Sequence, residues 1–209
     1  MHRFLHLSVF LVGLLVATAS QANTTAQPLT TADDLGPQVD QPIEFPHDRH
    51  AGDADKGGMQ INCMYCHTYA RRSIVAGIPS LQKCIGCHQG IESVRETPRI
   101  KKLFEYWEGS ADGTIKAKTP IPWKKVHDLP DFVRFSHERH IQRFYFQQDK
   151  PVQEVCGYCH GDVKTMTVAR RSKSLSMGWC VSCHEKDHLL DATSTKTAQG
   201  PNDCWQCHK

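Results

Sequence analysis

Cysteine and histidine recur along this chain of 209 residues in one fixed arrangement, Cys-x-x-Cys-His. Five copies account for all ten cysteines: Cys63, Cys66 and His67; Cys84, Cys87 and His88; Cys156, Cys159 and His160; Cys180, Cys183 and His184; Cys204, Cys207 and His208. Two thiols three positions apart on a short turn can add to the two vinyl groups of one porphyrin, and the adjoining imidazole can then bind its iron. Each copy therefore predicts the covalent attachment of one c-type haem, and the chain is predicted to carry five.

Disulfide bonds and zinc binding are the alternative uses of so many cysteines. Neither explains why a histidine follows the second cysteine in every copy. A structural zinc site pairs one Cys-x-x-Cys with a second Cys or His pair at a distance, and a disulfide framework has no need of histidine. The repeated motif therefore favours haem.

The composition agrees with a protein built around cofactors. Five haems leave roughly 40 residues for each, too few for a conventional apolar core. Hydrophobic residues make up 39% of the sequence and aromatic residues 8%. We expect the porphyrins to form the interior in place of packed layers of secondary structure. The predicted fold class is a multihaem cytochrome c: mostly irregular coil with short α-helices around stacked haems, and little or no β-sheet.

The formal net charge of +3 does not indicate nucleic-acid binding. A ferric haem with two axial imidazoles and two ionised propionates carries about one negative charge, so five haems make the loaded protein mildly acidic. The basic sequence is therefore no evidence for a nucleic-acid or anionic-membrane partner.

The amino terminus has the pattern of an export signal. Arg3 precedes a largely apolar run from Leu7 to Ala19, and small residues follow at Ser20 and Ala22. The run is shorter than the roughly 20 residues that span a bilayer, so we expect residues 1–22 to be a cleaved signal peptide, with an uncleaved membrane anchor as the alternative. Since haem is attached to cysteines outside the cytoplasm, the mature protein is predicted in the periplasm or on the outer face of the cytoplasmic membrane.

The rest of the chain divides where the composition and the motif spacing change. Residues 23–40 are polar, lack apolar periodicity and are predicted to be a flexible linker. The motifs then fall into a group of two and a group of three. We therefore predict a dihaem module at 41–95, a connecting helix and Pro-rich strap at 96–130, and a trihaem module at 131–209.

A Phe-x-His-x-x-His element precedes each group of motifs, from Phe45 to His50 and from Phe135 to His140. Ala-Arg-Arg-Ser also recurs, at 70–73 and 169–172. Such internal repetition indicates two related units. The repeated arginines can neutralise haem propionates, although a solvated surface is an equal interpretation. The two histidines of each element, three positions apart, project from nearly the same face of a helical turn. One turn can thus supply a ligand to each of two neighbouring irons.

Both halves resemble the class III cytochromes c, the small multihaem proteins of sulfur- and metal-reducing bacteria. In that family the first histidine of the element ligates the first haem of the module, and the second histidine ligates the next. The resemblance implies four pairs of iron ligands: His47 with His67, His50 with His88, His137 with His160, and His140 with His184.

The fifth site, at His208, departs from that family's pattern. Trihaem members take the third distal ligand from a histidine before the second attachment motif, but residues 161–179 contain none. His127, Met177 and His188 are the candidates, ranked in that order. Methionine would raise the potential of this haem relative to haems with two histidine ligands.

The connecting segment contains a predicted amphipathic helix that starts near Pro98. Its apolar residues stand at helical spacing: Ile100, Leu103, Phe104 and Trp107. We expect it to end at Gly109–Gly113 and to cover a haem edge or dock a partner. Residues 118–123 contain two prolines and are predicted to form an extended strap.

A closer resemblance is to the pentahaem cytochrome subunit of alternative complex III, over most of the mature chain. Its segments are the Phe-x-His-x-x-His element, Tyr106 to Glu108, Pro120 to Val133, and Met177 to Cys180. This resemblance favours His127 as a haem ligand. It implies peripheral membrane association with a quinol-oxidising assembly of an iron-sulfur subunit of molybdopterin-oxidoreductase type and polytopic subunits, and a downstream cytochrome or oxidase as acceptor. Because the sequence has no evident long membrane anchor, a sister complex is the alternative.

The histidine content favours electron transport over catalysis. Six histidines outside the motifs and the signal segment are available for five irons. Every iron can then be six-coordinate, whereas a catalytic haem needs an open position. We therefore predict an electron-transfer protein of a respiratory chain, without catalytic residues. A soluble periplasmic pentahaem donor to a reductase such as nitrite reductase, and a catalytic multihaem reductase, are the alternatives.

Overall fold

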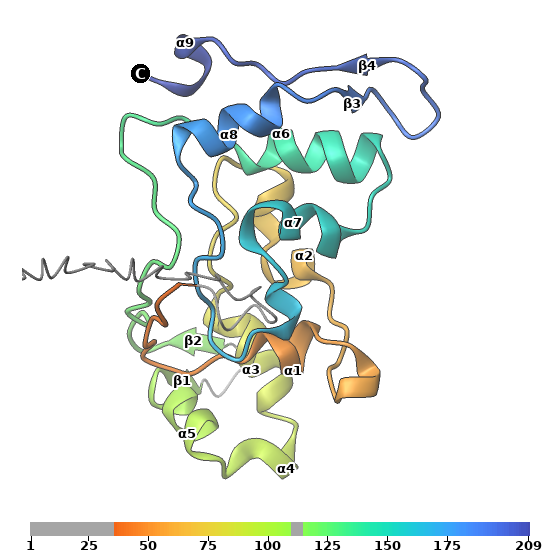
Figure 1. Ribbon diagram of the computed structural model, residues 1–209. Helices are drawn as coiled ribbons and strands as arrows, with labels where there is room; N and C mark the ends of the chain where they lie inside the picture. Colours follow the sequence, from red (N-terminus) through yellow and green to blue (C-terminus); the bar gives the residue numbers. More distant parts are fainter. Residues whose placement is uncertain (1–35, 110–114) are drawn as a thin grey trace, which may run out of the picture.

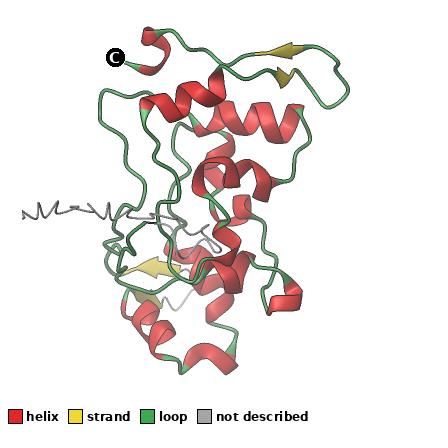
Figure 2. Cartoon of the chain, viewed as in Figure 1, coloured by secondary structure: helices red, strands yellow, loops and turns green. Residues whose placement is uncertain are grey.

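The computed structural model describes residues 36–109 and 115–209, so the predicted signal peptide and most of the predicted linker lie outside the described residues. Short helices joined by long irregular segments make up this part of the chain (Figures 1 and 2). Its sheets are two small antiparallel pairs of strands. The predicted fold class, short helices and coil with little sheet, is confirmed.

The first half of the chain contains most of the short elements. They are α1 (His47–Ala51), η2 (Ala54–Lys56), α2 (Cys63–Cys66), η3 (Thr68–Arg71), α3 (Leu81–His88), α4 (Glu92–Arg95), α5 (Pro98–Glu105), β1 (Trp107–Gly109) and β2 (Ile115–Ala117).

The second half begins with the second Phe-x-His-x-x-His element. It contains α6 (His137–Ile141), the π-helix η4 (Gln142–Gln147), α7 (Val152–His160), η5 (Val163–Thr165), α8 (Met177–His184), β3 (His188–Leu189), β4 (Thr197–Ala198) and α9 (Cys204–Cys207).

Every Cys-x-x-Cys pair lies on one of these helices, α2, α3, α7, α8 or α9. Polar side chains cap the amino-terminal ends of two of these helices. Asn62 Oδ1 accepts a hydrogen bond from the Met64 amide at the start of α2, and Ser176 Oγ accepts one from the Trp179 amide at the start of α8. Residues three apart share a helix face, so both thiols of each motif are presented on the same side.

The predicted connecting helix is confirmed as α5, with Pro98 in its first turn. It ends at Glu105, earlier than predicted, because Trp107 pairs with Ala117 in the β1–β2 hairpin and is strand instead of helix. Leu103 of α5 is buried together with Ile43, Leu81 and Ile85. The helix therefore covers α3, which carries the second attachment motif.

The predicted strap, residues 118–123, contains neither helix nor strand. Its end is tied to the beginning of the described chain through the Gln41 side chain. Gln41 Nε2 donates to the Lys124 carbonyl, and Gln41 Oε1 accepts from the Lys124 amide, both at 2.9 Å. This pair of hydrogen bonds fixes the strap alongside residue 41.

The two Phe-x-His-x-x-His helices pack reciprocally across the halves of the molecule. Helix α1 lies against η5, where the Asp48 amide donates to the Met166 carbonyl at 3.1 Å. Helix α6 lies against η3, and the His137 and Glu138 amides donate to the carbonyls of Ile74 and Ser73. Each helix thus packs on the segment that follows the first attachment motif of the other half.

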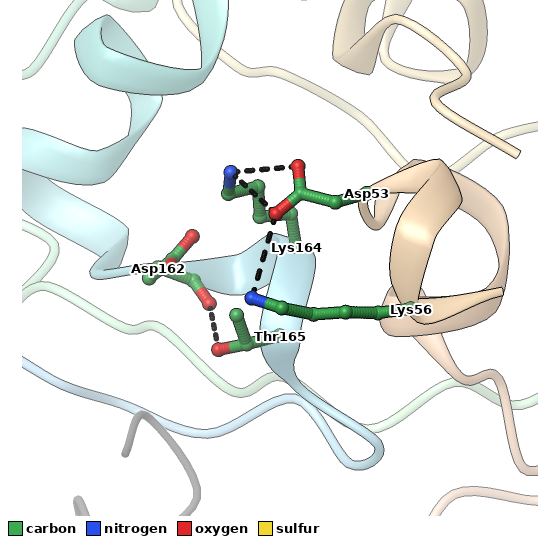
Figure 3. A network of polar contacts seen from close by, with 5 residues as sticks. All are labelled: Asp53, Lys56, Asp162, Lys164 and Thr165. Atoms are coloured by element: carbon green, nitrogen blue, oxygen red, sulfur yellow. Dashed lines mark hydrogen bonds and ion pairs between the residues drawn. The ribbon is translucent and has the colours of Figure 1, made fainter. Parts of the chain in front are cut away.

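Apolar and charged contacts reinforce this junction. Ala70 of η3 is buried with Ile141, Phe144 and Val155 from the second half. On the other side, Lys164 Nζ lies 2.9 Å from Asp53 Oδ1, and Lys56 Nζ lies 3.7 Å from Asp53 Oδ2 (Figure 3). The Lys164 hydrogen bond lowers the pKa of the Asp53 carboxyl. The boundaries of the predicted modules stay predictions, but the two halves are in contact through α1 with η5 and α6 with η3.

Within residues 36–109 and 115–209, no helix has the length and apolar character needed to cross a membrane.

Replacement of Ile85 by alanine tests whether the small core around α3 supports the fold. Ile85 is fully buried, so Ile85→Ala should lower the free energy of unfolding of the haem-loaded protein by about 2–5 kcal/mol. Chemical denaturation followed by far-ultraviolet circular dichroism measures it. The matched variant Ile91→Ala, at a side chain that is 39% exposed, should cost about 0.5 kcal/mol or less. Equal effects of the two substitutions would contradict the assignment of the core.

Candidate haem attachment and ligand sites

The five attachment motifs lie in a single row. Their order along this row differs from their order in the sequence. Burial, and then the neighbouring Cys66, raise the pKa of Cys84, so the second motif lies beside the first. A hydrogen bond with the Cys156 thiol lowers the pKa of Cys63 and places the third motif on the other side of the first. The motif cysteines of the described chain form no disulfides.

The row continues through the second half. Burial is the main cause that raises the pKa of Cys159 to about 11, and Cys183 and Cys180 of the fourth motif raise it further. Burial likewise raises the pKa of Cys180, and Cys207 of the fifth motif adds to it. The order is therefore second, first, third, fourth and fifth motif. Figure 1 shows the helices that carry them in the same sequence, from α3 near the bottom through α2, α7 and α8 to α9 at the top.

Three of the four histidine pairs predicted to bind iron face each other at similar distances. The ring centres are 6.1 Å apart for His50 and His88, 6.2 Å for His137 and His160, and 6.1 Å for His140 and His184. An iron bonded to one nitrogen of each of two imidazoles at about 2 Å holds the ring centres roughly 6 Å apart. These pairs are spaced as axial ligands of one metal. In the remaining pair, His67 lies close enough to His47 to contribute to lowering its pKa.

Backbone carbonyls orient many of these imidazoles through Nδ1. Such contacts join His50 to Pro46, His67 to Gly77, His137 to Ile74, His140 to Ser136, and His184 to Pro201. Because a carbonyl can only accept, each Nδ1 must carry the proton, and Nε2 keeps a lone pair for a metal. This is the usual outer-shell arrangement of metal-binding histidines.

Phe45 and Phe135 complete the two repeated elements. The Phe45 ring stacks on His50 at 4.3 Å and meets His47 edge-on at 4.9 Å. The Phe135 ring stacks on His140 at 4.7 Å and meets His137 edge-on at 4.8 Å. One phenylalanine therefore orients both distal histidines of its element, a role that its repetition at the same spacing signals in the sequence.

The imidazoles are held in the neutral form that can bind a metal. Burial, reinforced by His67 and His50, lowers the pKa of His47 to about 4. Burial, followed by His127, lowers the pKa of His160 to about 3. At neutral pH these rings are uncharged, and a neutral imidazole is required for ligation.

The candidates for the fifth site lie at different places. His127 contacts His160 of the third motif, with His127 Nε2 3.2 Å from His160 Nδ1. His188 Nε2 lies 3.1 Å from the Cys183 carbonyl, and Met177 is 70% exposed at the start of α8. The His208 ring itself stacks on Phe132 at 5.7 Å. The distal ligand of the fifth site, including the choice of His127, stays a prediction.

Arg170 adds an observation that fits a haem. Its side chain is only 8% exposed, and its Nε is buried without a hydrogen-bond partner. Its Nη1 contacts the Gly36 carbonyl at 3.4 Å. A buried guanidinium calls for an anion, and a porphyrin propionate is one. Arg171 instead donates to the carbonyls of Lys173 and Ser174. Paired imidazoles, free thiols on helix faces and a buried cation thus fit covalently attached haem.

Comparison with known proteins supports this assignment. The family described as cytochrome c7 and related cytochrome c matches residues 133–209. The chain is also 28% identical, over 187 residues, to the multihaem cytochrome c subunit of menaquinone reductase from Nitratidesulfovibrio vulgaris. The alignment covers 82% of this chain and 78% of that protein.

The fold class of the chain is therefore that of a multihaem cytochrome c. Its carboxyl-terminal part, residues 133–209, is a cytochrome c7-type domain. The finer resemblance, to the subunit of alternative complex III, stays a prediction.

Replacement of His140 by alanine tests the ligand pairs. Removing this imidazole should leave the iron held by His184 five-coordinate, so that the loaded protein gains one high-spin haem and binds carbon monoxide. Electron paramagnetic resonance and visible spectra measure both. Glu138→Ala is the matched control, because this exposed residue lies on the same helix α6 but outside the ligand pairs, and it should leave every haem low-spin. A spectrum of His140→Ala that matches the unaltered protein would reject the pairing.

Proposed function

We propose that this chain is the electron-transfer subunit of a membrane assembly that reacts with a quinone, on the outer face of the cytoplasmic membrane. It carries five c-type haems and exchanges electrons between that assembly and a downstream carrier. The observation that carries the proposal is the single row of five attachment motifs, three of which have paired imidazoles at about 6 Å.

The similarity to a menaquinone reductase subunit supports the quinone-linked role. That relative's name describes a subunit of a complex, which supports partners of the kind expected from the sequence: an iron-sulfur or molybdopterin-type subunit and polytopic membrane subunits. The export pattern in residues 1–22 supports placement outside the cytoplasm.

When bound, c-type haems accept and release single electrons at their irons. The chain's own residues would hold the haems: the cysteines would bind each porphyrin covalently, and the paired histidines would supply nitrogen ligands to its iron. Since Phe45, Phe135 and the backbone carbonyls hold these rings, the ligands need little rearrangement between redox states. This arrangement favours transfer over substrate turnover.

The two ends of the row differ in their surroundings. The second motif, on α3, is covered by the connecting helix α5 and the residues packed with Leu103. The fifth motif, on α9, is open, and its Trp205 is 80% exposed. The row of sites therefore has one covered end and one open end, at which electrons can enter or leave.

The direction of electron transfer between the chain and the quinone is a matter for experiment. The resemblance to the alternative complex III subunit implies that electrons come from a quinol, whereas the relative is named as a reductase of menaquinone. Both directions use the same subunit and the same row of sites.

Exchange with menaquinone in native membranes tests the proposal. The tagged chain should co-purify with quinone-reactive membrane subunits. In that complex its haems should be reduced by a menaquinol analogue, or should reduce the corresponding quinone, as followed by visible absorption. Complex lacking the chain should lose electron exchange with the external carrier. Recovery of the chain solely as a free periplasmic protein, with no electron exchange with quinone in either direction, would overturn the proposal and favour the soluble donor.

A further inference from the structure

His160 makes a contact unlike those of the other attachment-motif histidines His67 and His184. In His67 and His184, Nδ1 bonds to a backbone carbonyl, that of Gly77 or Pro201. In His160, Nδ1 faces the Nε2 atom of His127 at 3.2 Å. The two rings are nearly perpendicular, with centres 4.3 Å apart and an interplanar angle of 88°. The outer-shell partner of His160 is therefore an imidazole.

The geometry at His160 separates the partner from the ligand. His137 lies 6.2 Å from the His160 ring with the two planes 6° apart, the spacing of two ligands on one metal. The His127 ring is too close to His160 for an iron to lie between them, since that requires ring centres roughly 6 Å apart. His127 instead has its nitrogen at hydrogen-bonding distance from Nδ1.

The direction of this hydrogen bond follows from the ligand role of His160. With Nε2 committed to the iron, Nδ1 carries the proton and donates it to His127 Nε2. The His127 ring stands nearly perpendicular to His160 and presents its Nε2 to Nδ1 at 3.2 Å, so this nitrogen accepts the hydrogen bond through its lone pair. A neutral imidazole nitrogen is a stronger base than an amide oxygen. The His160 ring therefore gains more negative character than His67 or His184, whose partners are carbonyls.

We propose that His127 is a positioning residue for His160 and, through this hydrogen bond, lowers the reduction potential of the haem attached to Cys156 and Cys159. A more electron-rich axial imidazole stabilises the ferric state, because hydrogen bonding to the axial ligand tunes the potential of a haem. The third motif is the middle of the row and joins the two halves of the chain. The inference rests on the haem-bearing part of the proposed function, and not on the identity of the partners.

A redox titration of the loaded protein tests the proposal. His127→Phe keeps a ring of similar shape but removes the acceptor nitrogen. One of the haem components should move to higher potential, the others should stay in place, and all haems should remain low-spin by electron paramagnetic resonance. His137→Ala, which removes the distal ligand of the same iron, should alter the same component and thereby assign it to the third site.

His127→Gln offers a carbonyl acceptor and should shift that component by less than His127→Phe. It also serves if the phenylalanine variant does not fold. Gln153→Ala, at an exposed neutral side chain of α7, is the matched control and should leave the third-site component unchanged. Unaltered potentials in both His127 variants would overturn the proposal, as would a new high-spin haem, which would make His127 an iron ligand. A shifted component in a protein that exchanges no electrons with quinone would support this inference and reject the proposed function alone.

Discussion

The reciprocal packing of α1 on η5 and of α6 on η3 is the constraint on which the rest of the structure depends. These two helices carry the distal histidines of both halves, so the contact that joins the halves also places the ligands. It brings Cys63 next to Cys156 and makes the first and third motifs neighbours in the row. The order of the sites therefore follows from how the halves meet, and not from their order along the chain.

The described part of the chain has little apolar core of its own. The residues that bind haem organise the fold in place of such a core. The two clusters around Ile85 and Phe144 have four buried members each. Elsewhere the backbone itself is used: carbonyls fix the imidazoles, and irregular segments supply those carbonyls at the required places. A fold with long helices or sheets would commit these carbonyls to its own hydrogen bonds. The irregularity of the chain is thus a requirement of its ligand sites.

Much of the site could be predicted because its chemistry is local in sequence. The attachment motifs, the histidines three apart and the helix after Pro98 each depend on spacings of a few residues. The strand at Trp107 could not be predicted, because its partner lies across a turn and competes with a good helical pattern. Nor could the contact of His127 with His160, or the carbonyl partners of His67 and His137, since these depend on long-range packing. The repeated phenylalanine was visible in the sequence, but its stacking on His50 and His140 needed the structure.

The junction between the halves has the symmetry of an isologous dimer. Each Phe-x-His-x-x-His helix contacts the segment after the other half's attachment motif, so equivalent surfaces meet in both directions, as two copies of one subunit would. A contact of this kind uses the central surfaces of both halves. Their outer ends take no part in it and can differ from each other. One end has gained α5 as a cover for α3. The other has a further attachment motif on α9, so a symmetric centre carries two different ends.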